Sequence, residues 1–342
     1  MAHIVWDRFG NPANFCEPFA GSLAVLLERP HEPRCETIND KDCYLANFWR
    51  SLKMAPAELC RWADWPVNEA DLHARHSWLM GREEFREKMM TDPEYFDPRL
   101  AGWWVWGLSM WIGGGWCGVI SRDRADGTSR RGRPYLTSPG HGMHRKRPIM
   151  KRGGVGVQRV RPSMTANGVH RSLPDLGGDS GAYGRGVHAS ALESREGSLM
   201  AYFEALAARL RRVRVCCGDW TRVLGYSPTT AIGKTAVFLD PPYNSERDPE
   251  LYRTDDMTVS TAVREWAIQN GDNPDMRIAL CGYEGEHDMP DDWSVVAWST
   301  NGGYGNQSKR VDARAKLNKT RERIWFSKHC LKPTQPEFIY GT

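Results

Sequence analysis

The chain has 342 residues and a formal net charge of +4, with 40% hydrophobic and 26% charged residues. This length suits one large or two modest domains with a sizeable core, and no apolar run is long enough to span a bilayer. The N-terminal residues lack a signal-peptide pattern, and nine cysteines occur without a Cys-x-x-Cys pair. We therefore expect a cytoplasmic protein with reduced thiols, without a membrane partner and without a zinc site.

The positive charge is concentrated in residues 118–190, which hold 14 arginines and lysines against four acidic residues. The local balance is +10, so the rest of the chain carries −6. This glycine-rich segment predicts contact with a polyanion such as DNA, because each neutralised phosphate releases counterions. The alternative is a soluble insertion without a binding role. The candidate DNA-binding residues are Arg130, Arg131, Arg133, Arg145, Lys146, Arg147, Lys151 and Arg152.

The first third of the chain predicts two strands followed by several helices. A strand and a tight turn over 13–22 lead into the start of a helix at 23–27. A short strand over 36–40 precedes a helix over 44–53, where apolar residues recur with helical period. We expect residues 54–100 to form helices interrupted by prolines, and residues 101–111 to form a tryptophan-dense stretch. Residues 118–190 are predicted to be rich in loops.

The last third predicts alternating strands and helices. The first helix covers 198–212, with Ser198 as a candidate N-cap. The predicted strands are 213–217, 235–239, 277–281, 295–298 and 323–327, with a helix over 258–270. Such alternation predicts an α/β fold with a mostly parallel sheet, closed by the last two strands. We assign the core to 1–100 and 200–330, an inserted region to 101–199 and a tail to 331–342.

The motif Asp240-Pro241-Pro242-Tyr243 directly follows the apolar strand at 235–239. In open α/β sheets, ligands bind at the carboxyl ends of the strands. The two prolines fix the loop and leave carbonyl groups that can accept hydrogen bonds. A carboxylate, carbonyl groups and a flat ring together suit a planar amine, such as the exocyclic amino group of a nucleobase. The alternative is an ordinary turn, since aspartate and proline favour turns.

Other carboxylates also follow predicted strands. Asp40 at the end of the second strand is placed to accept hydrogen bonds from ribose hydroxyls, and Gly21 permits close approach of a ligand. Neither a dinucleotide-binding nor a phosphate-cradling glycine motif is present, which favours a nucleoside-bearing cofactor without a pyrophosphate. S-adenosylmethionine fits this description, with Glu17 at its cationic end and Asp219 at its adenine amino group. As alternatives, Asp40 caps a helix and Asp219 is a turn residue.

The order of these motifs resembles the DNA adenine-N6 methyltransferases of the DNA adenine methylase (D12) family, including phage-type members. The resemblance rests on Glu17-Pro-Phe-Ala-Gly21, then Ile38-Asn-Asp40, then an insertion, then Asp240-Pro-Pro-Tyr243. It implies a Rossmann-like, S-adenosylmethionine-dependent methyltransferase core with an inserted target-recognition region. The stretch from Trp103 to Trp116 is similar in position to a family helix beside the DNA, and its alternative is core packing. The cofactor residues so implied are Glu17, Pro18, Phe19, Ala20, Gly21, Asp40, Asp219 and Trp220.

The resemblance also implies a mechanism on double-stranded DNA. The target adenine is flipped out of the duplex, and Tyr243 stacks on it. Asp240 and the Pro241 carbonyl accept hydrogen bonds from its N6 amino group, and the methyl group is transferred directly, without a metal. The expected catalytic residues are thus Asp240, Pro241, Pro242 and Tyr243. A cognate restriction endonuclease is a possible partner but is not required.

The sequence departs from the family pattern in one respect, and three alternative functions stay open. Family members usually carry a lysine-rich, glycine-containing motif before the first strand, whereas here only a short leader with Trp6-Asp-Arg-Phe-Gly10 precedes it. The pocket residues also suit a cytosine-N4 methyltransferase, which more often has serine in place of Asp240. RNA or protein-amide methyltransferases share a similar pocket, the latter with asparagine at this position. A DNA-binding relative without catalytic activity is the remaining alternative.

Overall fold

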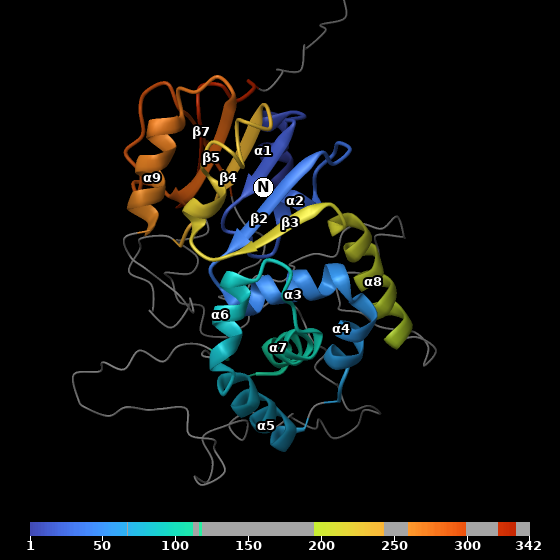
Figure 1. Cartoon of the computed structure of the whole chain (residues 1–342). Coiled ribbons are helices and arrows are strands. Elements are labelled where there is room, and N and C mark those ends of the chain that lie inside the picture. Colours follow the sequence, from blue (N-terminus) through green and yellow to red (C-terminus); the bar gives the residue numbers. More distant parts are fainter. Residues whose placement is uncertain (67, 112–115, 118–194, 243–258, 299–320, 333–342) are drawn as a thin grey trace, which may run out of the picture.

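The computed structural model describes residues 1–66, 68–111, 116–117, 195–242, 259–298 and 321–332. Within these ranges the chain forms a sheet with helices over both faces and a further group of helices at one side (Figure 1). No helix in these ranges has the length and apolar character that crossing a membrane requires.

The sheet has the strand order β3-β2-β1-β4-β5-β7-β6. The first five strands in this order run parallel, and β7 is antiparallel to both of its neighbours. The predicted α/β class, the mostly parallel sheet and the closing strand pair are thus confirmed. The strands are β1 (Asn14–Glu17), β2 (Cys35–Asp40), β3 (Val213–Cys217), β4 (Thr235–Leu239), β5 (Met276–Tyr283), β6 (Ser294–Ala297) and β7 (Glu322–Phe326).

Strand β4 shows how the two faces of the sheet are covered. All five of its residues are buried, as expected for a central strand. Because side chains alternate along a strand, Ala236 and Phe238 join one hydrophobic cluster while Val237 and Leu239 join another. The first cluster includes residues of α1 (Ala2–Phe9), α2 (Ala24–Leu27), α3 (Cys43–Met54) and α8 (Arg195–Leu210). The second includes residues of the 3-10 helix η4 (Trp220–Val223) and of α9 (Val259–Asn270).

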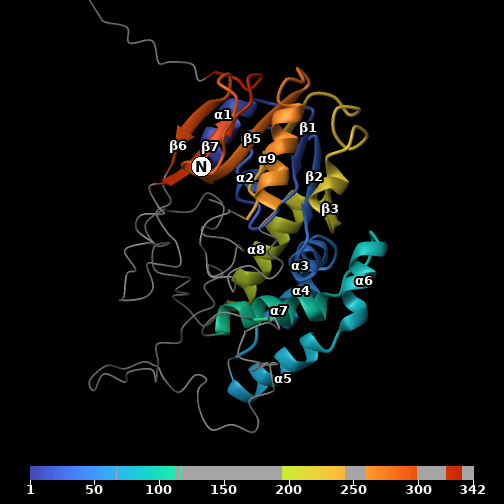
Figure 2. The ribbon, with the colours of Figure 1, turned by 90° about the vertical axis from the view of Figure 1, so that its left-hand side faces the viewer.

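A group of helices is inserted between β2 and β3. After α3 come α4 (Pro56–Ala63), α5 (Glu69–Met80), α6 (Glu83–Thr91) and α7 (Pro98–Met110). Figures 1 and 2 both show these helices gathered below the sheet. Of the predicted breaks, Pro56 begins α4, whereas Pro66 and Pro93 lie between helices. The boundary placed at residue 101 lies inside α7, which contacts α3 and α4.

The tryptophans of α7 serve mainly in the core. Trp104 and Trp106 are buried, so the packing alternative holds for them, whereas Trp103 is only half-buried. Gly107 lets Trp116 pack against the helix, because a Cβ at this glycine would lie 1.8 Å from the indole ring. The indole Nε1 of Trp116 donates to the Trp104 carbonyl at 3.0 Å.

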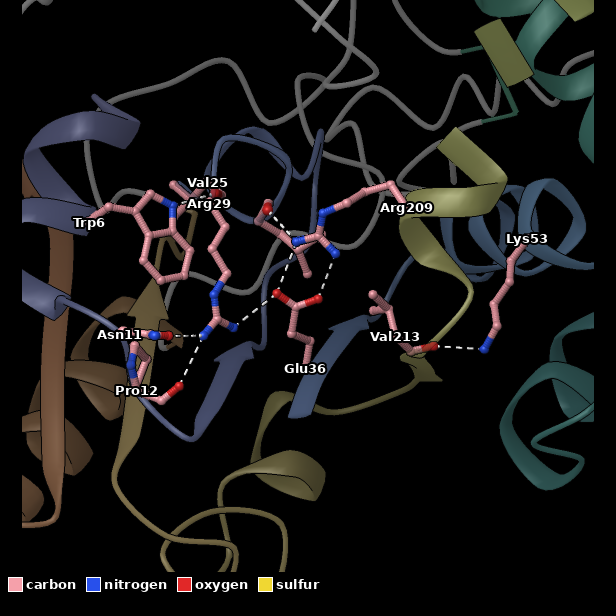
Figure 3. Close-up of polar contacts among 10 residues, drawn as sticks. Trp6, Asn11, Pro12, Val25, Arg29, Glu36, Lys53, Arg209 and Val213 are labelled. Atoms are coloured by element: carbon pink, nitrogen blue, oxygen red, sulfur yellow. Dashed lines mark hydrogen bonds and ion pairs between the residues drawn. The ribbon is translucent and has the colours of Figure 1, made fainter. Parts of the chain in front are cut away.

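Helix α8 is tied to the sheet by an ion-pair cluster around the buried Glu36 of β2 (Figure 3). Arg29 donates to Glu36 Oε1 at 3.1 Å, and Arg209 of α8 donates to both carboxylate oxygens at 2.7 and 2.9 Å. Such bidentate geometry is the strongest form of an arginine–carboxylate pair. The expected N-cap at Ser198 is wrong, because α8 begins three residues earlier at Arg195 and Ser198 lies within the helix.

Candidate functional site

Four carboxylates follow four neighbouring strands. Glu17 ends β1, Asp40 ends β2, and Asp219 and Asp240 follow β3 and β4. Because β3, β2, β1 and β4 are adjacent and parallel, their carboxyl-terminal ends lie on the same side of the sheet, and these residues lie there side by side. The strand order reverses between β1 and β4, and such a switch point is where open α/β sheets bind ligands. The structure therefore brings together the strand ends that the sequence singled out.

The loop after β1 is held by the end of β2. The Ala20 amide donates to the Asn39 carbonyl at 2.9 Å, and the Gly21 amide donates to Asp40 Oδ2 at 3.1 Å. Trp49 of α3 donates its indole N–H to the Gly21 carbonyl at 3.2 Å. Gly21 has φ +48°, a left-handed conformation that favours glycine. A Cβ there would lie in ordinary contact with the Phe19 carbonyl oxygen at 3.9 Å, so the backbone conformation rather than crowding favours glycine at this position.

Asp40 organises the neighbouring backbone. Its Oδ1 accepts from the Asp42 amide at 2.8 Å, and its main-chain carbonyl accepts from the Gly218 amide at 3.0 Å. The N-cap alternative for Asp40 is wrong in its simple form, because Asp42 caps α3 by accepting from the Tyr44 amide at 3.0 Å. These bonds orient the Asp40 carboxylate at the end of β2.

Asn39 joins two loops of the site, a role that the sequence did not reveal. Its side-chain amide donates to the Pro18 carbonyl at 3.1 Å and to the Gly218 carbonyl at 3.0 Å. The residue is buried in β2 between β1 and β3, and its Oδ1 has no hydrogen-bond partner among the described residues. Because β2 also contains Glu36, Thr37 and Asp40, its local sequence does not distinguish Asn39 from the other polar residues of the strand.

Glu17 is the most unusual charge at this edge. It is 2% exposed, and its Oε2 has no hydrogen-bond donor within the described part of the chain. Burial first and the nearby Asp240 second raise the pKa of Glu17 well above its ordinary value, while the Leu26 amide opposes the shift. A buried acceptor without a donor is costly. A cation placed beside Glu17 would remove this cost and lower the pKa again.

Asp240 is half-buried at the end of the fully buried β4, and the following Pro241 is buried. Its charge contributes to raising the pKa of both Glu17 and the buried Cys281 of β5, although burial is the larger cause in each case. Asp240 thus lies close to Glu17 across the switch point. Pro242 is half-buried, and Tyr243 lies outside the described residues.

Asp219 and Trp220 follow β3. The Asp219 Oδ1 accepts from the Thr221 amide at 3.0 Å and from its hydroxyl at 2.5 Å, so Asp219 caps η4. This contact agrees with the turn alternative, and binding of an adenine amino group by Asp219 stays a prediction. Trp220 stacks on Phe19 with ring centroids 6.2 Å apart, and Trp266 of α9 meets Trp220 edge-on at 6.4 Å.

These three rings form an aromatic wall next to the strand ends. Phe19 and Trp220 were predicted, whereas Trp266 was missed because nothing in the sequence of α9 distinguishes it from a packing residue. Comparison of the chain with models of known protein families and with curated proteins finds no match. The predicted DNA-binding residues lie outside the described residues. They are Arg130, Arg131, Arg133, Arg145, Lys146, Arg147, Lys151 and Arg152.

Proposed function

We propose that the protein transfers a methyl group from S-adenosylmethionine to the N6 amino group of adenine in DNA. The observation that carries this proposal is the convergence of Glu17, Asp40 and Asp240 at the switch point between β1 and β4. Glu17 suits the cationic end and Asp40 the ribose of a nucleoside-bearing cofactor. Asp240 lies in a motif suited to an amino group. Glu17 and Asp40 are the last residues of β1 and β2, and Asp240 directly follows β4.

The sheet topology supports the proposal. Its first five strands follow the order 3-2-1-4-5 of nucleotide-binding sheets. The antiparallel β7 between β5 and β6 departs from the all-parallel dinucleotide-binding order. The sheet is compatible with the Rossmann-like core that the resemblance implies. A fold of this kind hosts many activities, so the site residues carry the functional argument.

The residues at the edge fit S-adenosylmethionine in chemistry. Glu17, buried and with no donor to its Oε2 among the residues that the structure describes, would accept the ammonium group. Asp40 would accept from the ribose hydroxyls, and Phe19 and Trp220 would offer aromatic surface to the adenine. When bound, S-adenosylmethionine supplies an electrophilic methyl group on its sulfonium.

The motif after β4 would act on the target base. Asp240 and the Pro241 carbonyl would accept hydrogen bonds from the N6 amino group and direct the nitrogen toward the methyl donor. Tyr243 would stack on the flipped adenine, which offsets part of the lost base stacking at about 1–3 kcal/mol per base. Asp240 or water would take the proton as the new N–C bond forms.

The proposal is tested by expressing the chain in a bacterial strain without DNA methylation and analysing the nucleosides of its DNA. We expect N6-methyladenine with the wild-type protein. Asp240→Ala should retain the fold and lower the rate by orders of magnitude, because it removes the acceptor for the amino group. Asp275→Ala, at the exposed residue before β5, is the matched control and should keep the rate.

The nucleoside analysis also separates the alternatives. N4-methylcytosine in place of N6-methyladenine would assign the chain to the cytosine-N4 class. Unmodified DNA together with absent S-adenosylmethionine binding would favour a catalytically inactive relative. A near-normal rate for Asp240→Ala would contradict the proposed role of the motif.

A further inference from the structure

Two cysteines lie in contact beside the proposed nucleoside end of the site. Cys43 is the first residue of α3, and Cys217 is the last residue of β3. They are 174 residues apart in sequence, yet their Sγ atoms are only 3.5 Å apart. Both are free thiols. A disulfide requires sulfurs about 2.05 Å apart, so a displacement on the order of 1.5 Å would join this pair.

The two thiols differ in character. Cys217 donates its S–H to Cys43 Sγ, and this bond is the main cause that lowers the pKa of Cys43. The same bond, together with burial, raises the pKa of Cys217. Cys43 also occupies the first position of a 12-residue helix, where the backbone amides favour a thiolate. Cys43 is therefore the nucleophile, and Cys217 is its neighbouring thiol.

We propose that Cys43 and Cys217 form a reversible disulfide when the protein meets a hydroperoxide, and that this disulfide weakens binding at the nucleoside end of the site. The thiolate of Cys43 attacks one oxygen of hydrogen peroxide, the O–O bond breaks, and the released hydroxide takes a proton to form water. Cys217 then attacks the sulfenic sulfur of Cys43, the S–O bond breaks, and a second water leaves with the thiol proton. Both thiols are oxidised by one electron each, and one peroxide is reduced to two waters.

The disulfide would act on Asp40 from both sides. Cys43 directly follows Asp42, whose amide donates to Asp40 Oδ1 at 2.8 Å. Cys217 directly precedes Gly218, whose amide donates to the Asp40 carbonyl at 3.0 Å. Drawing the two sulfurs together shifts both donors relative to Asp40. This half of the inference rests on the proposed role of Asp40 in cofactor binding, whereas disulfide formation does not.

Disulfide formation is tested by oxidising the reduced full-length protein with stoichiometric hydrogen peroxide, blocking the remaining thiols and digesting with trypsin. We expect the peptides 42–50 and 215–222 to become cross-linked, with fragmentation placing the bond on Cys217 rather than Cys216. Cys35 and Cys216 are more exposed, so they are the internal controls. Oxidation of either before Cys43, or a bond between Cys216 and Cys217, would overturn the assignment.

The effect on binding is tested by calorimetry with S-adenosylmethionine before and after oxidation. We expect oxidation to weaken binding by about tenfold or more, equivalent to about 1.4 kcal/mol, and dithiothreitol to restore it. Cys43→Ser should keep its affinity in peroxide, whereas Cys35→Ser should lose affinity as the wild type does. Equal affinity in both redox states would overturn the effect on the site. Absence of binding by the reduced protein would instead contradict the proposed function, and the cross-link would still decide the thiol pair.

Discussion

Glu17 is proposed to bind the ammonium group of the cofactor, yet burying its carboxylate lowers the stability of the folded protein. The carboxyl group is buried, close to Asp240, and its pKa is raised mainly by burial. Below the ordinary value of 4.5 both the folded and the unfolded chain hold the proton, and the contribution of Glu17 to stability is fully present. Between pH 4.5 and the raised folded pKa, the unfolded chain has lost the proton that the folded chain still holds. The free energy of unfolding therefore falls as the pH rises through this range, and the contribution is lost above the folded pKa.

We therefore expect Glu17→Gln to stabilise the protein at pH 8 by about 1–3 kcal/mol, since it removes a buried acidic group without a full set of donors. The difference should vanish near pH 4, and urea unfolding at both pH values measures it. Glu28→Gln, at an exposed glutamate after α2, should change little at either pH. A Glu17→Gln protein that is less stable at pH 8 would show that Glu17 is satisfied without a ligand.

Asp40 carries a second prediction at this scale. Asp40→Ala removes the acceptor proposed for the ribose and frees the Gly21 amide. We expect S-adenosylmethionine binding, measured by calorimetry, to weaken by about tenfold to a hundredfold, because hydrogen bonds to charged groups contribute about 1.5–3 kcal/mol.

Asp42→Ala provides the matched control for Asp40. It removes the cap of α3 at the Tyr44 amide and leaves the Asp40 side chain in place. The expected cost is about 1 kcal/mol of stability, with a smaller loss of affinity than Asp40→Ala shows. Equal loss of affinity in the two variants would assign the effect to the α3 start rather than to Asp40.

At the scale of elements, the Glu36 cluster decides whether α8 and β2 stay together. Arg29 and Glu36 are almost completely buried, and Arg209 is 21% exposed at its side chain. Breaking a buried pair leaves an uncompensated charge, at a cost of about 3–5 kcal/mol. We expect Glu36→Gln to lower the free energy of unfolding by this amount in a urea titration.

The surface pair Glu84–Lys88 offers a comparison of the same chemistry without burial. Its atoms are 3.5 Å apart and its glutamate side chain is 86% exposed. Glu84→Gln should cost less than about 0.5 kcal/mol. If the two glutamine variants had similar effects, Glu36 would not hold α8 in the way that Figure 3 suggests.

The elements themselves were largely predictable from the sequence. The strand at 235–239 is a continuous apolar run, and Asp240 with its prolines ends it clearly. The start of α8 was placed too late, because the sequence around Ser198 offers a cap that the helix does not use. Helix α7 was read only as a tryptophan-dense stretch, and its true start at Pro98 uses the Asp97 cap at the Leu100 amide.

At the scale of the whole molecule, charge should govern encounters with DNA. Binding that neutralises phosphates weakens with salt, with a slope of about −0.9 per phosphate contacted. Replacing the basic residues between 130 and 152 with glutamine should flatten this slope in a fluorescence binding assay. Arg211→Gln with Arg212→Gln, at the amino-terminal end of β3 and away from the strand ends that carry Asp40 and Asp240, should leave the slope almost unchanged.

The candidate site was only partly predictable from the sequence, because some of its residues meet only once the whole chain has folded. Residues at strand ends, such as Glu17 and Asp40, are marked by their own local sequence. Asn39 and Trp266 become informative only through neighbours that lie far away in the chain. The contact between Cys43 and Cys217 likewise joins the start of α3 to the end of β3, which are 174 residues apart in the sequence. Local patterns carry no record of such pairs.

The strand order has a consequence for how the chain folds during synthesis. Strand β1 lies between β2 and β4, yet β2 ends at Asp40 and β4 begins only at Thr235. At about 5–20 residues per second, a ribosome needs about 10 to 40 s to make the intervening chain. During this time the edge of β1 that β4 later covers stays open, and open edges can pair with other chains. The early helices α1 to α7 are then the main cover for the nascent sheet, and contacts of such high sequence separation should make completion of the sheet the slow step of folding.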